Sequence, residues 1–190
     1  MANGATPPMD TTEIVAQAAG IVGFLLAAYS FQEKNNKRFF IEQGLSGLMF
    51  FLNFLLTGAV SAALFNLVNL VRGVLYAKNG KRIWKLVLLE ALYTACFVYA
   101  LVPIIHNGFE IFLSGITYVA LVLMTVLMWR GNGKHIRYAQ FAFVSPAWIV
   151  HNIFHFSLGG ILCEVFNMVS VVISFIRYGK NGFDGAEKTK

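Results

Sequence analysis

Polar side chains recur at matched positions inside two apolar stretches of this chain. The segment FNLVNLV in the first half aligns without a gap with FNMVSVV in the second half, so that Asn66 pairs with Asn167 and Asn69 pairs with Ser170. A buried amide costs free energy unless it is hydrogen-bonded. Polar residues at equivalent positions of two apolar segments therefore indicate a structural or functional role: they form hydrogen bonds either between helices or to a polar solute.

A second set of polar and aromatic residues lies on one face of a later predicted helix. Trp148, His151, Asn152 and His155 are spaced as on one side of a helix, and Glu164 follows shortly after. A histidine paired with Glu164 would suit proton-coupled transport, because protonatable groups inside a membrane mark ion pathways. Ordinary helix packing is the alternative. Only Glu164 could complete a metal site with the two imidazoles, so neither a metal nor another cofactor is predicted.

Long apolar runs must position these residues. The 190 residues are 57% hydrophobic and 13% charged, whereas soluble domains are about 25% charged. The net charge of +6 resides in short loops between apolar runs, which argues against a nucleic-acid partner. A strand-like alternation is absent, so the fold class is an all-α integral membrane protein. The predicted spans are Thr12–Phe31, Phe39–Leu56, Val60–Ala77, Ile83–Pro103, Phe109–Trp129, Ile136–Phe156 and Leu158–Tyr178.

The placement of Lys and Arg predicts the orientation. Of the 15 such residues, all but Arg72 lie in the loops after spans one, three and five, in the C-terminal tail, or within three residues of the span ends that adjoin them. Cytoplasmic loops carry the excess of basic residues. The N-terminus is therefore expected outside and the C-terminus in the cytoplasm, with seven crossings. Arg72 is expected to extend its side chain to the headgroups.

The matched segments belong to a longer internal repeat. In the second helix of each unit, Ser46 and Asn53 match Ser145 and Asn152. Two three-helix units can be parallel only if an odd helix lies between them, which predicts a site between the units near the midplane. The expected division is an N-terminal tail and first repeat over residues 1–82, an inverting linker helix over 83–105, a second repeat over 106–178 and a cytoplasmic tail over 179–190.

The residues also carry a family resemblance. Trp148-Ile-Val-His-Asn152, followed by SLGG, Glu164 and Arg177, resembles the YgjV family of bacterial inner membrane proteins over most of the chain. This resemblance implies a multi-pass protein of the bacterial inner membrane. The arrangement of three, one and three helices also resembles the SWEET and PnuC transporters. SWEET proteins have an asparagine in the third helix of each repeat, where Asn66 and Asn167 stand here.

These observations favour a small polar solute transporter or facilitator, with alternating access between the two units. The expected substrate pathway comprises Asn66, Asn69, Asn167, Ser170, Trp148, Asn152 and Asn53, and the expected proton-coupling residues are His151, His155 and Glu164. The alternative is a membrane-embedded binding, receptor or accessory protein on the same scaffold. No pattern of an enzyme is present. The expected partners are membrane lipid and the solute. The sequence does not determine the oligomeric state, but Gly20, Gly23 and Ala27 would allow close helix packing with a second copy of the chain.

Overall fold

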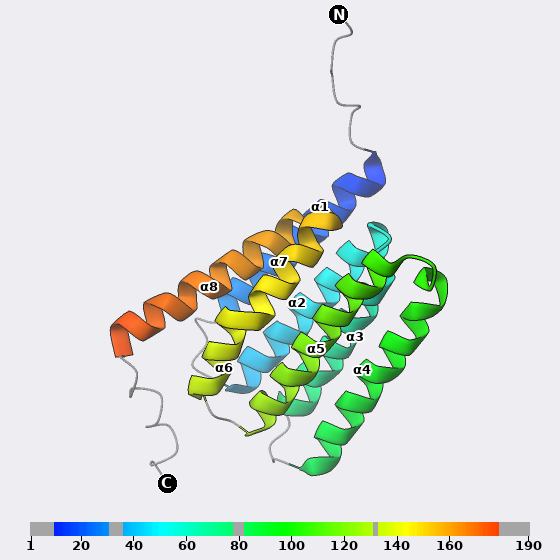
Figure 1. Ribbon diagram of the computed structural model, residues 1–190. Helices are drawn as coiled ribbons and strands as arrows, with labels where there is room; N and C mark the ends of the chain where they lie inside the picture. The colour runs from blue at the N-terminus through cyan, green and yellow to red at the C-terminus, as the bar shows by residue number, and fades with distance from the viewer. Residues whose placement is uncertain (1–9, 31–35, 78–81, 131–132, 179–190) are drawn as a thin grey trace, which may run out of the picture.

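The described chain is built of helices only, as the sequence predicts. A computed structural model describes residues 10–30, 36–77, 82–130 and 133–178, and within these ranges every regular element is a helix. The elements are α1 (Thr11–Ser30), α2 (Asn36–Leu56), α3 (Val60–Ala77), α4 (Ile83–Ile104), α5 (Gly108–Arg130), α6 (Gly133–Ala139), the π-helix η1 (Gln140–Val144), α7 (Ser145–Phe154) and α8 (Leu158–Tyr178). Because α6, η1 and α7 follow one another without a break, these elements form seven helical rods (Figure 1).

Local sequence signals start several of these helices. The backbone N–H of Asp10 donates to Glu13 Oε2 over 3.3 Å at the start of α1, and the N–H of Glu110 donates to Asn107 Oδ1 over 3.2 Å at the start of α5. Ser157 accepts from the N–H of Gly160 over 3.3 Å and so caps α8. Such bonds satisfy backbone donors that have no partner inside the helix. The turn between α2 and α3 uses Gly58 at φ 78°, a conformation that glycine adopts without strain.

The predicted sixth span is not one uniform α-helix, and this is a correction to the sequence reading. The five residues of η1 interrupt it directly before Ser145 and Pro146. Proline has no backbone N–H to donate to residue Ala142, and its ring crowds the carbonyl there. A π-turn accommodates this by widening the helix locally, and such turns are frequent at functional sites.

The helices pack in a closed circuit with α4 on its outside. Within the first half α2 packs against α1 and α3, and within the second half α7 packs against α5 and α8. The halves meet where α1 contacts α8 and where α3 contacts α5, while α4 packs on α3 and α5. Accordingly, α4 lies at one side of the bundle and α8 at the opposite side (Figure 1).

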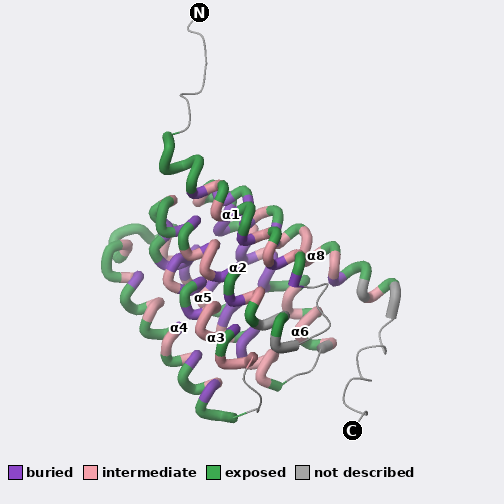
Figure 2. Tube along the Cα trace, turned by 180° about the vertical axis from the view of Figure 1, so that it is seen from behind, coloured by how far each residue is buried: buried purple, intermediate pink, exposed green. Residues whose placement is uncertain are grey.

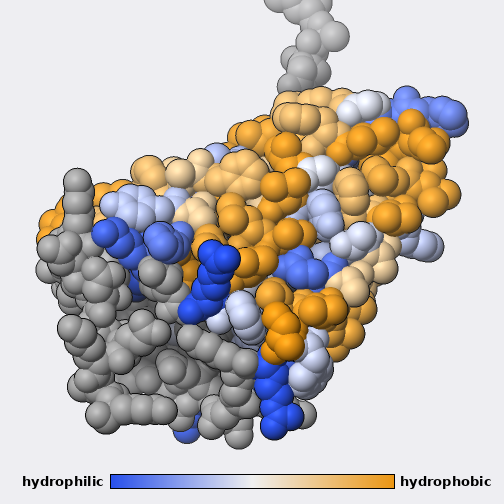
Figure 3. Space-filling view, turned by 60° about the horizontal axis from the view of Figure 1, so that its bottom comes forward, coloured by the Kyte–Doolittle hydropathy of each residue, from blue (hydrophilic) through white to orange (hydrophobic). Residues whose placement is uncertain are grey.

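The rods have two distinct ends. We call the end where α1, α3, α5 and α8 finish the basic end, because Arg82, Arg130, Lys134 and Arg137 lie there. We call the opposite end, with the turns at residues 57–59, 105–107 and 155–157, the turn end. Hydrophilic side chains on the face shown in Figure 3 gather toward the basic end, next to an otherwise largely apolar surface.

The outward faces of the helices are apolar. Four helices, α1, α3, α4 and α5, are long and apolar enough to cross a membrane, and shorter apolar stretches cover Ile41–Leu56 in α2 and Leu158–Ile173 in α8. Large hydrophobic side chains such as Tyr99, Val102 and Ile176 are more than 60% exposed, and exposed residues follow the outer side of α4 in Figure 2. An apolar surface of this extent fits contact with lipid.

Candidate solute-binding cavity

A cavity of about 640 Å³ lies inside the circuit of helices. Its described lining residues come from α1, α2, α3, α5, α8 and the rod formed by α6, η1 and α7, and none of them comes from α4. At the turn end the lining stops near Phe54, Asn152 and Gly160, and toward the basic end it reaches Arg72 and Arg137. This volume falls in the range of small-molecule sites, about 300–1,000 Å³.

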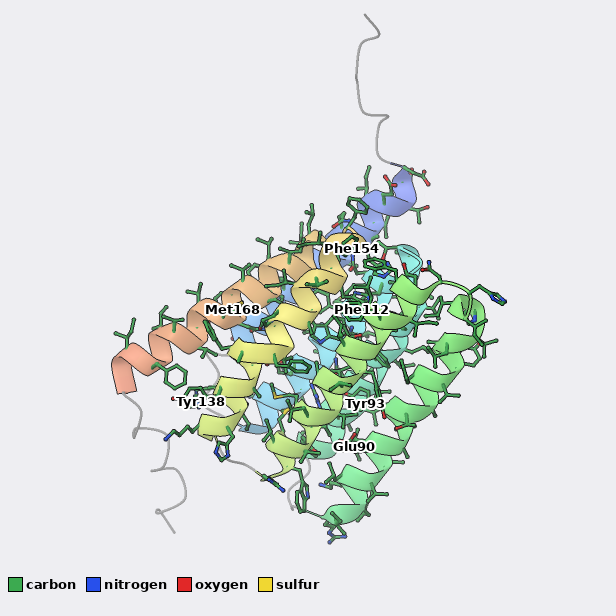
Figure 4. All side chains as sticks on the ribbon, in the orientation of Figure 1. Glu90, Tyr93, Phe112, Tyr138, Phe154 and Met168 are labelled. Atoms are coloured by element: carbon green, nitrogen blue, oxygen red, sulfur yellow. The ribbon has the colours of Figure 1, made fainter. Side chains whose placement is uncertain are left out.

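The predicted polar stripe of α3 faces this cavity. Asn66 and Asn69 both line it, and Asn69 Nδ2 donates to Asn66 Oδ1 over 3.3 Å. Asn66 Nδ2 also donates to the Ala62 carbonyl within the same helix, over 2.9 Å. The buried Tyr93 extends from α4 toward α3 (Figure 4), and its hydroxyl donates to Asn69 Oδ1 over 2.6 Å. Tyr93 therefore orients the amide of Asn69 from behind the cavity wall.

Arg72 completes this stripe. The sequence predicts that the Arg72 side chain extends to the lipid headgroups. In the structure, Arg72 lines the cavity instead. Its Nη1 donates to Thr125 Oγ1 of α5 over 3.2 Å, which places the guanidinium between the two halves of the bundle.

The matching stripe of α8 is centred on a carboxylate. Glu164, Asn167 and Ser170 line the cavity on α8. Glu164 Oε2 accepts three hydrogen bonds: from Ser145 Oγ over 2.7 Å, from Gln140 Nε2 over 3.2 Å and from Asn167 Nδ2 over 3.3 Å. Gln140 begins the π-helix η1 and Ser145 follows it directly. The hydrogen bonds of these two residues to Glu164 therefore join the irregular segment of the sixth rod to α8.

At the turn end of the cavity, an amide lies among aromatic rings. Asn152 is only 2% exposed, and its Oδ1 has no hydrogen-bond partner among the described residues. A methyl group on Gly160 would lie 2.6–2.7 Å from the Asn152 amide, so a larger residue there would require this side chain to shift. Trp148 and Phe54 line the cavity beside it, with ring centroids 5.9 Å apart.

Beyond these rings, hydrogen bonds between the two halves close the turn end. Asn53 is fully buried and does not belong to the cavity lining. Its Nδ2 donates to the Ala16 carbonyl over 2.7 Å, and its Oδ1 accepts from Ser157 Oγ over 2.6 Å. The structure therefore places Asn53 in a packed contact between α1, α2 and the turn at residues 155–157, whereas Asn152, with which the sequence aligns it, faces the cavity.

The α1–α8 contact strengthens this closure. Gln17 Nε2 donates to the carbonyl of Phe156 over 2.6 Å, and Gln17 Oε1 accepts from the N–H of Leu158 over 3.1 Å. Phe156 has φ 51°, a strained conformation for a residue with a side chain, and the Gln17 amide holds the peptide groups around it. Next to this clamp, the backbones of Gly20 and Gly159 lie in direct contact.

The small residues of α1 are used within the chain. Gly20, Gly23 and Ala27 are buried, with Gly20 against Asn53 and Gly159, and Gly23 against Phe50. The face that would allow close packing with a second copy is thus occupied by α2 and α8 of the same chain.

The two histidines of the predicted coupling group lie outside the cavity lining. His151 is fully buried between the rings of Phe54 and Trp148, and its ring centroid is 4.3 Å from that of His155. His155 Nε2 is 3.3 Å from Glu110 Oε2 of α5. The carboxylate next to the histidines is therefore Glu110, while Glu164 bonds to Ser145, Gln140 and Asn167.

Several cavity residues were not foreseen from the sequence. Gln140, Phe50 and Phe54 line the cavity, and Gln17 and Ser157 close its turn end. Gln140 could have been singled out as a polar side chain within a predicted span, and Pro146 was a usable signal for a distorted helix. The phenylalanines gave none, because lipid-facing and cavity-facing phenylalanines look alike in an apolar run.

Fold and cavity together define an all-helical membrane protein with a polar and aromatic cavity enclosed between its helices. Comparison with protein families gives a match over residues 14–182 to Imp-YgjV, described as a bacterial inner membrane protein. The chain therefore belongs to the Imp-YgjV family of bacterial inner membrane proteins, as the sequence resemblance indicated. Comparison with curated proteins and with solved structures gives no match.

Proposed function

We propose that this protein moves a small polar solute across the bacterial inner membrane by alternating access. Seven crossings, an outer N-terminus and a cytoplasmic C-terminus are part of the proposal, as are two parallel three-helix units joined by α4. The observation that carries it is the cavity of about 640 Å³ between the two halves, lined by amides from both. Sites at the interface of two helix units are typical of transporters with repeats.

The asymmetry of the cavity supports this reading. At the turn end the halves are joined by the Asn53–Ser157 bond, the Gln17 clamp and the glycine contact of α1 and α8. Toward the basic end the lining continues to Arg72 and Arg137. With the proposed orientation, this is a state closed to the outside. Rocking of one unit against the other would break the bonds at the turn end and expose the cavity there.

The first test is a search for the solute. The detergent-purified full chain is screened by thermal shift against sugars, nucleosides, vitamins and amino acids, since a ligand that binds the native state raises its melting temperature. A hit is then assayed for counterflow in proteoliposomes. Binding with counterflow supports transport. Binding without counterflow supports the receptor or accessory alternative, and a blank screen of well-folded protein also argues against transport.

Paired asparagine variants separate solute contact from structural support. Asn167→Ala removes an amide that lines the cavity, and we expect it to weaken hit binding at least about tenfold with little loss of stability. Asn66→Ala should likewise weaken binding of the hit with little loss of stability. Asn53→Ala is the control, since it removes a fully buried amide outside the lining and should lower stability while the folded protein keeps its affinity. Equal affinity in all three variants would contradict the cavity assignment.

Reporter fusions test the orientation. A reporter active only in the cytoplasm should work when fused after Lys190 and should fail when placed before α1. The reverse pattern would overturn the proposed topology without bearing on the cavity.

A further inference from the structure

We propose that Glu164 and Asn167 form a subsite for an organic cation with N–H donors, so that the solute carries an amine, amidine or guanidinium group. The inference rests on the proposed function, because it names the chemical class of the solute that the cavity takes. It follows from three features of the cavity: a carboxyl group whose hydrogen-bond donors are all uncharged, an amide oxygen without a donor among the described residues, and aromatic side chains in the same lining.

The carboxyl group of Glu164 is held in place by hydrogen bonds and has no cationic partner among the described residues. Its three hydrogen-bond donors, Ser145, Gln140 and Asn167, are all uncharged. The ion pair between His155 and Glu110 does not involve Glu164. A carboxylate within a membrane protein is costly unless a positive charge compensates it. A cationic group of the solute would supply that charge.

The amide of Asn167 offers a second acceptor at the same place. Its Nδ2 donates to Glu164 Oε2, so its Oδ1 is turned away from the carboxylate. This oxygen is buried, and the described residues provide no donor for it. An unpaired buried acceptor costs about 1–3 kcal/mol. Because Asn167 and Glu164 are three positions apart on α8, both acceptors lie on one helix face. A solute group with two or more N–H bonds could donate to both.

The aromatic side chains of the cavity lining are suited to the same cationic group of the solute. Trp148, Phe54 and Phe50 line the cavity, with ring centroids 5.9 Å apart for the first pair and 6.2 Å for the second. The faces of such rings attract cations, most strongly in the case of tryptophan. In the proposed subsite a planar amidinium or guanidinium contacts these rings and donates hydrogen bonds along its edge to the acceptors of α8.

The basic residues of the lining do not fill this subsite. Arg72 donates to Thr125 Oγ1, and both Arg72 and Arg137 lie where the cavity extends toward the basic end. Their charge disfavours a bare cation in that part of the cavity and would favour an anionic group there. The cationic group of the solute is therefore assigned to the Glu164 side.

The experiment uses two probes of nearly equal shape. Benzamidine is an aromatic amidinium at neutral pH, and benzamide is its uncharged counterpart. Binding of each to the detergent-purified full chain is measured by calorimetry. We expect the protein to prefer benzamidine by at least about tenfold, since hydrogen bonds to charged groups are about twice as strong as neutral ones. Glu164→Gln should remove this preference and leave benzamide binding within about twofold.

Two further variants control for loss of charge and for folding. Glu90→Gln removes another carboxylate whose oxygens are buried, but Glu90 belongs to α4 and does not line the cavity, so the preference should persist. Glu164→Asp keeps the charge on a shorter side chain and should keep the preference with weaker binding. If Glu164→Gln does not fold, Glu164→Asp decides the question: weaker binding of benzamidine with unchanged binding of benzamide supports the subsite, and unchanged binding of both probes overturns it.

The inference is overturned if the wild-type protein binds both probes equally, binds neither, or keeps its preference in Glu164→Gln. This failure differs from a failure of the proposed function. A neutral solute that binds and exchanges in counterflow would leave transport standing and remove the cation subsite. Benzamidine binding that depends on Glu164, in a protein whose screening hits show no counterflow, would keep the subsite and remove transport.

Discussion

Gly159→Ala is the substitution for which the structure predicts the largest local effect. A methyl group at position 159 would overlap the carbonyl group of Gly20 and lie 2.6 Å from the backbone nitrogen of Ile21, whereas ordinary contact begins at 3.4 Å. These neighbours are backbone atoms of α1, which cannot rotate away as a side chain would. The two helices must therefore separate by close to 1 Å or more at this point.

The cost of that separation has two parts. Forcing a methyl group into a packed contact typically costs about 1–3 kcal/mol. The displacement also strains the bonds that cross the same contact, those of Gln17 to the 156–158 turn and of Ser157 to Asn53, and each such bond contributes about 0.5–1.5 kcal/mol. We expect Gly159→Ala to lower the free energy of unfolding by about 2–4 kcal/mol.

The assay is equilibrium unfolding of the purified protein in mixed micelles, with Gly115→Ala as the matched control. Gly115 lies within α5, and a methyl group there would meet nothing within 4 Å. That substitution should be neutral or should stabilise by up to about 1 kcal/mol, because alanine favours helix. If Gly159→Ala unfolds within about 0.5 kcal/mol of the wild-type protein, the close α1–α8 contact is refuted.

Three further predictions follow from individual contacts. Ser157→Ala should lower stability by about 1–3 kcal/mol in the same unfolding assay, because it leaves the Asn53 Oδ1 acceptor buried without its donor, and an unchanged value would contradict the bond. A double-mutant cycle on Ser61 and Ser114, whose hydroxyls are 2.8 Å apart between α3 and α5, should give a coupling of about 0.6 kcal/mol, whereas additive effects would argue against that contact. Cys163 lines the cavity, so a solute found by screening should slow its alkylation several-fold, as measured by mass spectrometry, while the rate at the chain's other cysteine serves as the internal control and should not change.

Much of the helical framework was determined by the sequence alone. The predicted bounds of Val60–Ala77 and Leu158–Tyr178 coincide with α3 and α8, because long apolar runs between turn residues leave a membrane helix few alternatives. The inner membrane class was also predictable, and the family match confirms it. The matched amides Asn66 and Asn167 could be singled out for the same reason: polar groups stand out in an apolar helix.

Only the tertiary structure decided which polar groups meet. From sequence, Glu164 was paired with a histidine and Asn53 was assigned to the substrate pathway, but Glu164 bonds to Gln140 and Ser145, and Asn53 bonds to Ser157 outside the cavity lining. Partners across helices depend on how each helix is rotated about its axis and how closely two helices approach. The π-turn changes that rotation in the sixth rod, and the glycine contact of α1 and α8 sets the approach at the turn end. Neither quantity is contained in the spacing of residues along one helix, because both are set by packing between segments distant in sequence.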